Sequence, residues 1–126
     1  MAISPPSNQD FYSTMRQLKW SSTEKAIAQR CFDRALQREL DEAIQSVKEM
    51  AKKIRHASEL WELERHLTEL RKEIDRKYQF GASHLTQVLG ELLHEKRISE
   101  RELRGLHEDK LNSVRSFAKL LAESVA

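Results

Sequence analysis

The residues that most resemble a chemical site in this 126-residue chain are a glutamate and a histidine three positions apart. Glu91 and His94 form a Glu-x-x-His motif, which in carboxylate-bridged metal proteins places two ligands on one face of a helix. Such a centre needs a second copy of the motif and two further inward-facing glutamates. We find no second copy, and the charged Glu95 and Lys96 follow His94. We therefore expect no metal site and interpret the histidines as solvated.

Other routes to catalysis have as little support in the sequence. The chain has no Gly-rich phosphate loop and no nucleophile elbow, and its one cysteine, Cys31, has no histidine at a spacing known for a nucleophile. A single cysteine excludes an internal disulfide and fits a reducing compartment. We interpret Cys31 as a small, partly buried apolar residue. The sequence predicts a protein that is not an enzyme and has no cofactor.

A basic cluster offers a different chemistry, the binding of phosphates. Its members are Lys48, Lys52, Lys53, Arg55 and His56. Such side chains neutralise nucleic-acid phosphates, so one hypothesis is a nucleic-acid-binding or transcription-associated helical dimer. The same charges also stabilise the negative C-terminal end of a helix, which needs no further assumption. The net charge of +2 argues neither way, so we favour the helix-end interpretation and do not expect a nucleic-acid partner.

The residues best suited to hold a protein partner surround Trp61. Tryptophan and arginine are enriched among interface hot spots, and Glu64, Arg65 and Arg71 lie near Trp61 in the sequence. Trp61 is one position away from an apolar helical stripe that begins at Leu60, and helix packing alone does not require a large aromatic there. Two interpretations remain open: Trp61 fills a gap where two helices pass, or it anchors a partner. We predict a partner-binding surface formed by Trp61, Glu64, Arg65 and Arg71.

Long helices must position these residues. The composition, with 33% charged and 6% aromatic residues, is typical of long helices, and neither glycine nor proline occurs over residues 7–80. The capping-box pattern Ser21-x-x-Glu24 predicts the start of a first helix that extends to about Arg55. A second helix is expected over Leu60–Tyr78. The fold class predicted from these patterns is all-α, with two long helices forming an extended dimeric body plus a smaller C-terminal helical head.

Both long helices have an apolar stripe whose residues recur in steps of three and four. A first helix of the predicted length spans about 50 Å, whereas a compact domain of this size has a radius of gyration of about 14 Å. The helix therefore projects beyond any core of one chain, and a second copy is the simplest cover for its stripe. We predict a homodimer. Its interface is expected to contain Leu36, Leu40, Val47, Met50, Ile54, Leu63, Leu67 and Leu70.

The stripes also suggest how the chain is divided. We expect residues 1–19 to form a flexible N-terminal tail and residues 20–126 a single all-helical domain, with the dimerisation body at 20–79 and the head at 83–126. A second capping-box pattern, Ser99-x-x-Glu102, predicts the start of the last helix. The chain has neither an apolar run long enough to span a membrane nor a secretory signal at its N-terminus, so we expect a cytoplasmic protein without a membrane partner.

Three runs of residues resemble a known family. They are Arg38-Glu39-Leu40, Leu60-Trp61-x-Leu63 and Arg71-Lys72-Glu73-Ile74-Asp75-Arg76-Lys77-Tyr78. Together they are similar to the fluorescence recovery protein family of cyanobacteria, and the resemblance covers about residues 20 to 120 without gaps. It implies an all-α homodimer that is not an enzyme and has no pigment or metal of its own. In that family the partner is the C-terminal domain of the photoactivated orange carotenoid protein, whose return to the resting state is accelerated.

The resemblance also shows where this chain departs from the family. The family surface for the carotenoid protein uses a Trp, a following His-Asp pair and an Arg. Trp61 and Arg71 occupy the Trp and Arg positions, but Glu64 and Arg65 replace the pair. An arginine in place of an acidic residue inverts the local charge, and a basic group on the partner would be repelled. The scaffold is retained while the contact chemistry changes, which leaves the identity of the partner open.

Overall fold

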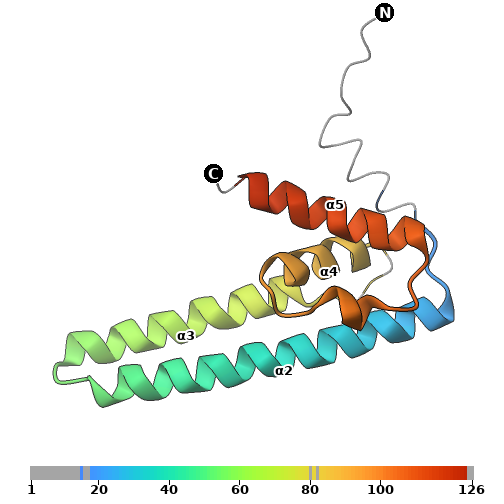
Figure 1. The fold of residues 1–126 in the computed structure, drawn as a ribbon. Helices are drawn as coiled ribbons and strands as arrows, with labels where there is room; N and C mark the ends of the chain where they lie inside the picture. Colours follow the sequence, from blue (N-terminus) through green and yellow to red (C-terminus); the bar gives the residue numbers. More distant parts are fainter. Residues whose placement is uncertain (1–14, 16–17, 80, 82, 125–126) are drawn as a thin grey trace, which may run out of the picture.

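The computed structural model describes residues 15, 18–79, 81 and 83–124, and this part of the chain is all-α without a strand (Figure 1). The predicted fold class is confirmed. The elements are the α-helices α2 (Ser22–Lys52), α3 (Ala57–Lys77), α4 (Leu85–His94) and α5 (Glu108–Ser124), with a 3-10 helix η1 (Glu100–Leu103) before α5. Figure 1 shows α2 and α3 as a long antiparallel hairpin that projects from a group formed by α4, η1 and α5.

The predicted capping box starts α2. The Ser21 hydroxyl accepts a hydrogen bond from the Glu24 N–H at 3.1 Å, and the Glu24 carboxylate accepts one from the Ser21 N–H at 3.1 Å. The helix ends at Lys52, three residues before the predicted Arg55. Two backbone donors at N-terminal helix positions are therefore satisfied, which explains why the start was predictable to the residue.

The second long helix begins earlier than predicted. α3 starts at Ala57, three residues before the predicted start at Leu60, and His56 is its N-cap. The Glu59 carboxylate accepts hydrogen bonds from the N–H groups of Arg55 at 3.3 Å and of His56 at 3.1 Å. Glu59 thus caps the start of α3 as Glu24 caps the start of α2.

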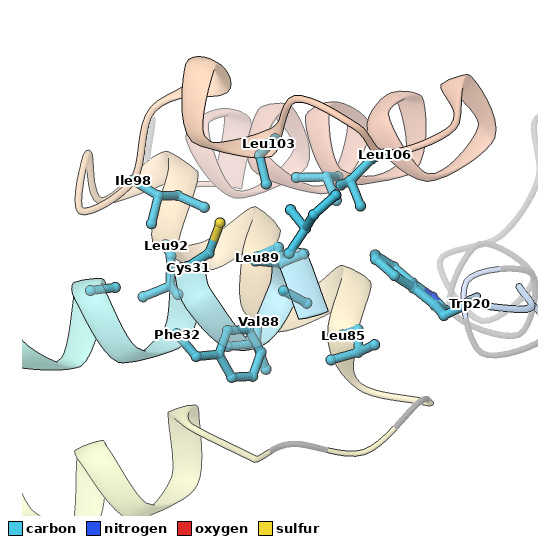
Figure 2. Close-up of a cluster of buried hydrophobic side chains, with 14 residues drawn as sticks. Trp20, Cys31, Phe32, Leu85, Val88, Leu89, Leu92, Ile98, Leu103 and Leu106 are labelled. Carbon is cyan, nitrogen blue, oxygen red and sulfur yellow. The ribbon is translucent and has the colours of Figure 1, made fainter. Parts of the chain in front are cut away.

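The hydrophobic core lies at the head end of the molecule and includes the N-terminal half of α2 (Figure 2). Figure 2 shows Phe32 and Cys31 from α2 beside Leu89 and Leu92 from α4. Cys31 is only 2% exposed, which is deeper than the partial burial we expected. The other core members are Trp20, Ile27, Ala28, Ala35, Leu85, Val88, Ile98, Leu103, Leu106 and Val114. α2 is therefore part of the core over its first four turns and leaves it near Ala35.

Helices α4 and α5 cross at a glycine. A Cβ atom built on Gly90 would lie 2.7 Å from Cδ1 of Phe117 and 3.1 Å from the carbonyl oxygen of Val114. Distances this short exclude a side chain at this position without a shift of one helix. Gly90 therefore permits the close approach that closes the head.

The start of the last helix was predicted incorrectly. The Ser99 and Glu102 pattern is a real capping box, but it starts the short η1, and α5 begins only at Glu108. Gly105 has φ = +100°, a left-handed conformation that ends helical geometry, and its missing side chain leaves room for Ile27. A Cβ on Gly105 would lie 2.6 Å from Cδ1 of Ile27. The chain reverses at Gly105, so α5 starts after the turn.

Most of the predicted flexible tail at residues 1–19 lies outside the described residues. Of the described positions, Met15 is 2% exposed and Leu18 packs against the core. The division into a tail, a body and a head stays a prediction.

A buried ionic network joins the hairpin to the head. The Lys77 ammonium donates to Glu39 at 2.7 Å and to Glu95 at 2.8 Å, and the Tyr78 hydroxyl donates to Glu39 at 2.7 Å. The side chains of Lys77 and Glu39 are 2% and 7% exposed. Burial and the Glu39 carboxylate raise the pKa of Tyr78 well above its ordinary value, so its hydroxyl stays a donor. Because each buried charge has an opposite partner, the end of α3 is tied both to α2 and to the segment after α4.

Candidate partner-binding surface

Beyond the head, the hairpin leaves an apolar groove open between α2 and α3. The groove has a volume of about 720 Å³. Its apolar lining consists of Leu40, Ala43, Ile44, Val47, Leu67, Leu70 and Ile74. Leu40, Ile44 and Leu67 are 39%, 50% and 44% exposed, which is high for large aliphatic side chains that face a neighbouring helix. We call this surface the hairpin groove.

The hairpin groove collects half of the residues predicted for the dimer interface. Leu40, Val47, Leu67 and Leu70 line it. The other four are partly exposed but do not line it: Leu36 and Met50 on α2, Leu63 on α3, and Ile54 in the turn between the two helices. The sequence prediction missed Ile44. A strict alternation of three- and four-residue spacings passes from Leu40 to Ala43 and then to Val47, and so omits position 44. Its signal was the (i, i+4) spacing from Leu40, which widens the stripe.

Trp61 is the most exposed of the large hydrophobic residues in the described chain, at 62%. It lies in the second turn of α3, near the tip of the hairpin, so it fills no gap within this chain. Glu64 and Arg65 are exposed three and four positions later, which places them beside Trp61 on one face of α3. This tip face combines an indole, a carboxylate and a guanidinium, all open to solvent.

The fourth predicted partner residue lies elsewhere. Arg71 is ten residues after Trp61, or about 15 Å along the helix, and it borders the hairpin groove. Within the described part of the chain, no carboxylate pairs with Arg65 or Arg71. Both guanidiniums are thus free to meet a partner. Arg71 is seven positions after Glu64, on the same side of α3 but two turns further from the hairpin tip.

The alternative sites also have defined positions in the structure. Lys48, Lys52, Lys53, Arg55 and His56 are all exposed along the last turns of α2 and the hairpin tip. The Lys52 ammonium lies 3.3 Å from Glu49, and Lys48 borders the hairpin groove. Glu91 accepts a hydrogen bond from Arg76 at 2.7 Å, so its carboxylate is engaged in an ion pair.

One group of residues has metal-ligating atoms close together, and it is not the predicted motif. Among the described residues, ligand atoms of Glu24, His107 and Asp109 lie within 4.8 Å of one another. The Lys110 ammonium is 3.4 Å from Glu24 and 3.2 Å from Asp109. A cation of the chain itself, the Lys110 ammonium, is therefore already paired with both carboxylates.

Comparison with known proteins places this arrangement in a family. Residues 20–118 match the family described as photoprotection regulator fluorescence recovery protein. The curated fluorescence recovery protein of Synechocystis sp. (strain ATCC 27184 / PCC 6803 / Kazusa) is 36% identical over 101 residues, which is 80% of this chain and 93% of that protein. The chain belongs to the fluorescence recovery protein family. This family membership makes it a regulatory protein of photoprotection.

Solved structures of the family have the same fold. The fluorescence recovery protein of Fremyella diplosiphon aligns with a TM-score of 0.76 at 35% identity, covering 80% of this chain and 99% of that chain. The structure from Synechocystis sp. PCC 6803 gives the same TM-score, identity and coverage. The proteins of this family are regulatory. None of the helices in the described part of the chain has the length and hydropathy needed to cross a membrane.

Proposed function

We propose that this chain is a non-enzymatic regulator that acts as a homodimer and binds a protein partner through the tip face of α3. By extension from the family, the proposed partner is the C-terminal domain of a photoactivated orange carotenoid protein. Binding would accelerate the return of that protein to its resting state. The observation that carries the proposal is the 62% exposure of Trp61, whose side chain is therefore not needed for packing within this chain.

The hairpin groove supports the homodimer. Its exposed leucines and isoleucines form an apolar stripe on both helices of one chain, and an equal stripe is available on a second copy. A two-fold interface joins the same patch on both subunits, so one groove can receive side chains of the other. This pairing removes the apolar surface from water and leaves the charged faces of α3 outside.

The mechanism follows from binding alone. A protein without catalytic groups accelerates a conformational relaxation when it binds most tightly to a conformation along the return path. The tip face offers an aromatic anchor with a carboxylate and a guanidinium beside it, which suits a polar protein surface. Glu64 and Arg65 stand where the family has its His-Asp pair, so the complementary partner surface must accept a changed charge pattern.

Binding to the isolated C-terminal domain of an orange carotenoid protein tests the proposal. We expect a complex with this domain on size-exclusion chromatography. With the whole orange carotenoid protein, we expect faster decay of the photoactivated form when the chain is added. Trp61→Ala should weaken the complex by about thirtyfold in Kd, the loss of a hot spot of about 2 kcal/mol. Melting followed by circular dichroism should change little, because Trp61 is exposed.

A matched control separates the anchor from a general surface effect. Lys72→Ala changes another exposed residue of α3 and should leave Kd within twofold. The proposal fails if no complex forms with the unmodified chain, or if Trp61→Ala and Lys72→Ala bind equally well.

A further inference from the structure

A second pocket lies in the head, away from the hairpin groove and the tip face. It has a volume of about 230 Å³ and lies between α2 and η1. Its lining consists of Arg30, Cys31, Arg34, Arg101, Glu102 and Arg104. Four of the six residues are arginines, so a positive charge is concentrated in a small space. We call it the arginine pocket.

The two helices present their arginines in matched pairs. Arg30 and Arg34 are four residues apart on α2, a spacing that puts them on one face of an α-helix. Arg101 lies within η1 and Arg104 is its C-cap, three residues later. In a 3-10 helix, residues three apart are stacked one above the other. Both pairs therefore project toward the same space.

Three of the guanidiniums have no partner among the described residues. In the part that the structure describes, no carboxylate or carbonyl contacts the side chains of Arg30, Arg101 or Arg104. Elsewhere in the head, by contrast, arginines are paired: Arg97 is 2.8 Å from Glu42 and 2.9 Å from a second glutamate. Like charges at an (i, i+4) spacing repel each other weakly, so an anion between Arg30 and Arg34 would relieve that repulsion.

A single carboxylate, that of Glu102, lies among the four arginines of the pocket. Oε1 of Glu102 accepts from Arg38 at 3.0 Å and from the Ser99 N–H at 3.2 Å, whereas Oε2 accepts no hydrogen bond among the described residues and lies 3.8 Å from Arg34. Burial, reinforced by the Glu102 carboxylate, raises the pKa of the Cys31 thiol to about 11, so it is neutral. Four guanidiniums against one carboxylate leave the pocket with a net positive charge that attracts an anion from outside the chain.

We propose that the arginine pocket binds a small phosphate-class oxyanion, held by Arg30, Arg34, Arg101 and Arg104. Arginine offers its N–H groups in a planar fork that matches the oxygens of phosphate. The volume is below the roughly 300 Å³ at which pockets for drug-sized ligands begin, which favours a small anion. The site is independent of the proposed function, because it shares no residue with the hairpin groove or the tip face.

Titration of the isotope-labelled chain with inorganic phosphate, at constant ionic strength set by sodium chloride, tests the site. We expect saturable shifts in the arginine Nε–H resonances of the four pocket residues. The double variant Arg101→Gln with Arg104→Gln should raise Kd at least about tenfold, because it removes two charge-assisted donors. As a control, Arg55→Gln removes one arginine charge at the hairpin tip, away from the pocket, and should leave the Kd for phosphate unchanged.

The source of the phosphate group is distinguished by two further titrations. O-phosphoserine and adenosine monophosphate present the group on an amino acid and on a nucleoside. Equal Kd values for all three ligands would show that the free group is recognised, and tighter binding of one ester would identify its carrier. The proposal is overturned if the shifts depend only on ionic strength, or if the double variant binds phosphate as well as the unmodified chain.

Discussion

Glu24 joins the start of α2 to the start of α5. Its carboxylate is 2% exposed and accepts hydrogen bonds from the N–H groups of Ser21 and His107, each at 3.1 Å. The Lys110 ammonium lies 3.4 Å away. Burial alone would raise the pKa of Glu24, but these donors more than offset it and lower the pKa from 4.5 to about 2. The start of α2 and the start of α5 are therefore joined through one ionised side chain.

This lowered pKa predicts a defined loss of stability in acid. A carboxyl that binds its proton less tightly in the folded chain than in the unfolded chain stabilises the fold above pH 4.5. That contribution, about 3 kcal/mol, should disappear as the pH falls from 4.5 toward 2. We expect Glu24→Gln to lower the free energy of unfolding at pH 7 by about 2 kcal/mol and to flatten its dependence on pH below 4.5. Urea unfolding at pH 7, 5 and 3 measures both effects.

The control for this prediction is Glu69→Gln, which changes an exposed glutamate of α3 without an ion pair in the described chain. It should follow the unmodified chain at each pH. Equal acid sensitivity of Glu24→Gln and the unmodified chain would contradict the role given to Glu24.

Sequence patterns identified single residues only where a local rule applies. The capping role of Ser21 and Glu24 was predictable because a capping box involves only four consecutive residues. The contact between Glu24 and His107 was not, because 83 positions separate the two residues. The four arginines of the pocket were missed for the same reason, since the pairs come from distant elements.

The crossing of α4 and α5 depends on an absent side chain. Gly90→Ala should destabilise the fold by about 1–3 kcal/mol, because the new methyl group meets Phe117 at 2.7 Å and overpacking outweighs the gain in helix propensity. Gly81→Ala is the control, because its Cβ would meet only the His84 ring at an ordinary 3.6 Å. Thermal unfolding of both variants measures the difference. A Gly90→Ala variant as stable as the unmodified chain would show that the helices can separate without loss.

The helices themselves were largely predictable, and their boundaries less so. Apolar periodicity and the lack of glycine and proline over residues 7–80 indicated α2 and α3. The start of the last helix was predicted too early, because a capping box at Ser99 can begin a 3-10 helix as well as an α-helix. The close approach of Ile27 to Gly105, which explains the turn there, is visible only in the structure. The network around Lys77 was also out of reach, since it needs three elements to be brought together.

The shape of the whole molecule follows from where its core ends. α2 leaves the core near Ala35, and the rest of the hairpin has only its own two helices to cover its apolar side chains. The hairpin groove is the result, and we expect a second chain to occupy it. The sequence analysis led to the same expectation of a dimer. A helix that extends beyond the core of its own chain exposes its apolar stripe, and a second chain can cover that stripe.

Charge in the hairpin groove should separate the subunits. Leu40→Glu places a carboxylate among the side chains of Ile44, Val47 and Leu67, where pairing would bury it without a partner. We expect monomers, or loss of folding, by sizing with light scattering. Gln45→Glu adds the same charge at an exposed α2 position that does not line the groove, and should leave the assembly intact.

The mass of the unmodified chain in solution tests the central claim most directly. Light scattering coupled to size-exclusion chromatography should give twice the chain mass of 14.8 kDa at micromolar concentration. A folded species of 14.8 kDa, with Leu40, Ile44 and Leu67 left in water, would contradict the account of the hairpin groove as the surface that joins two copies.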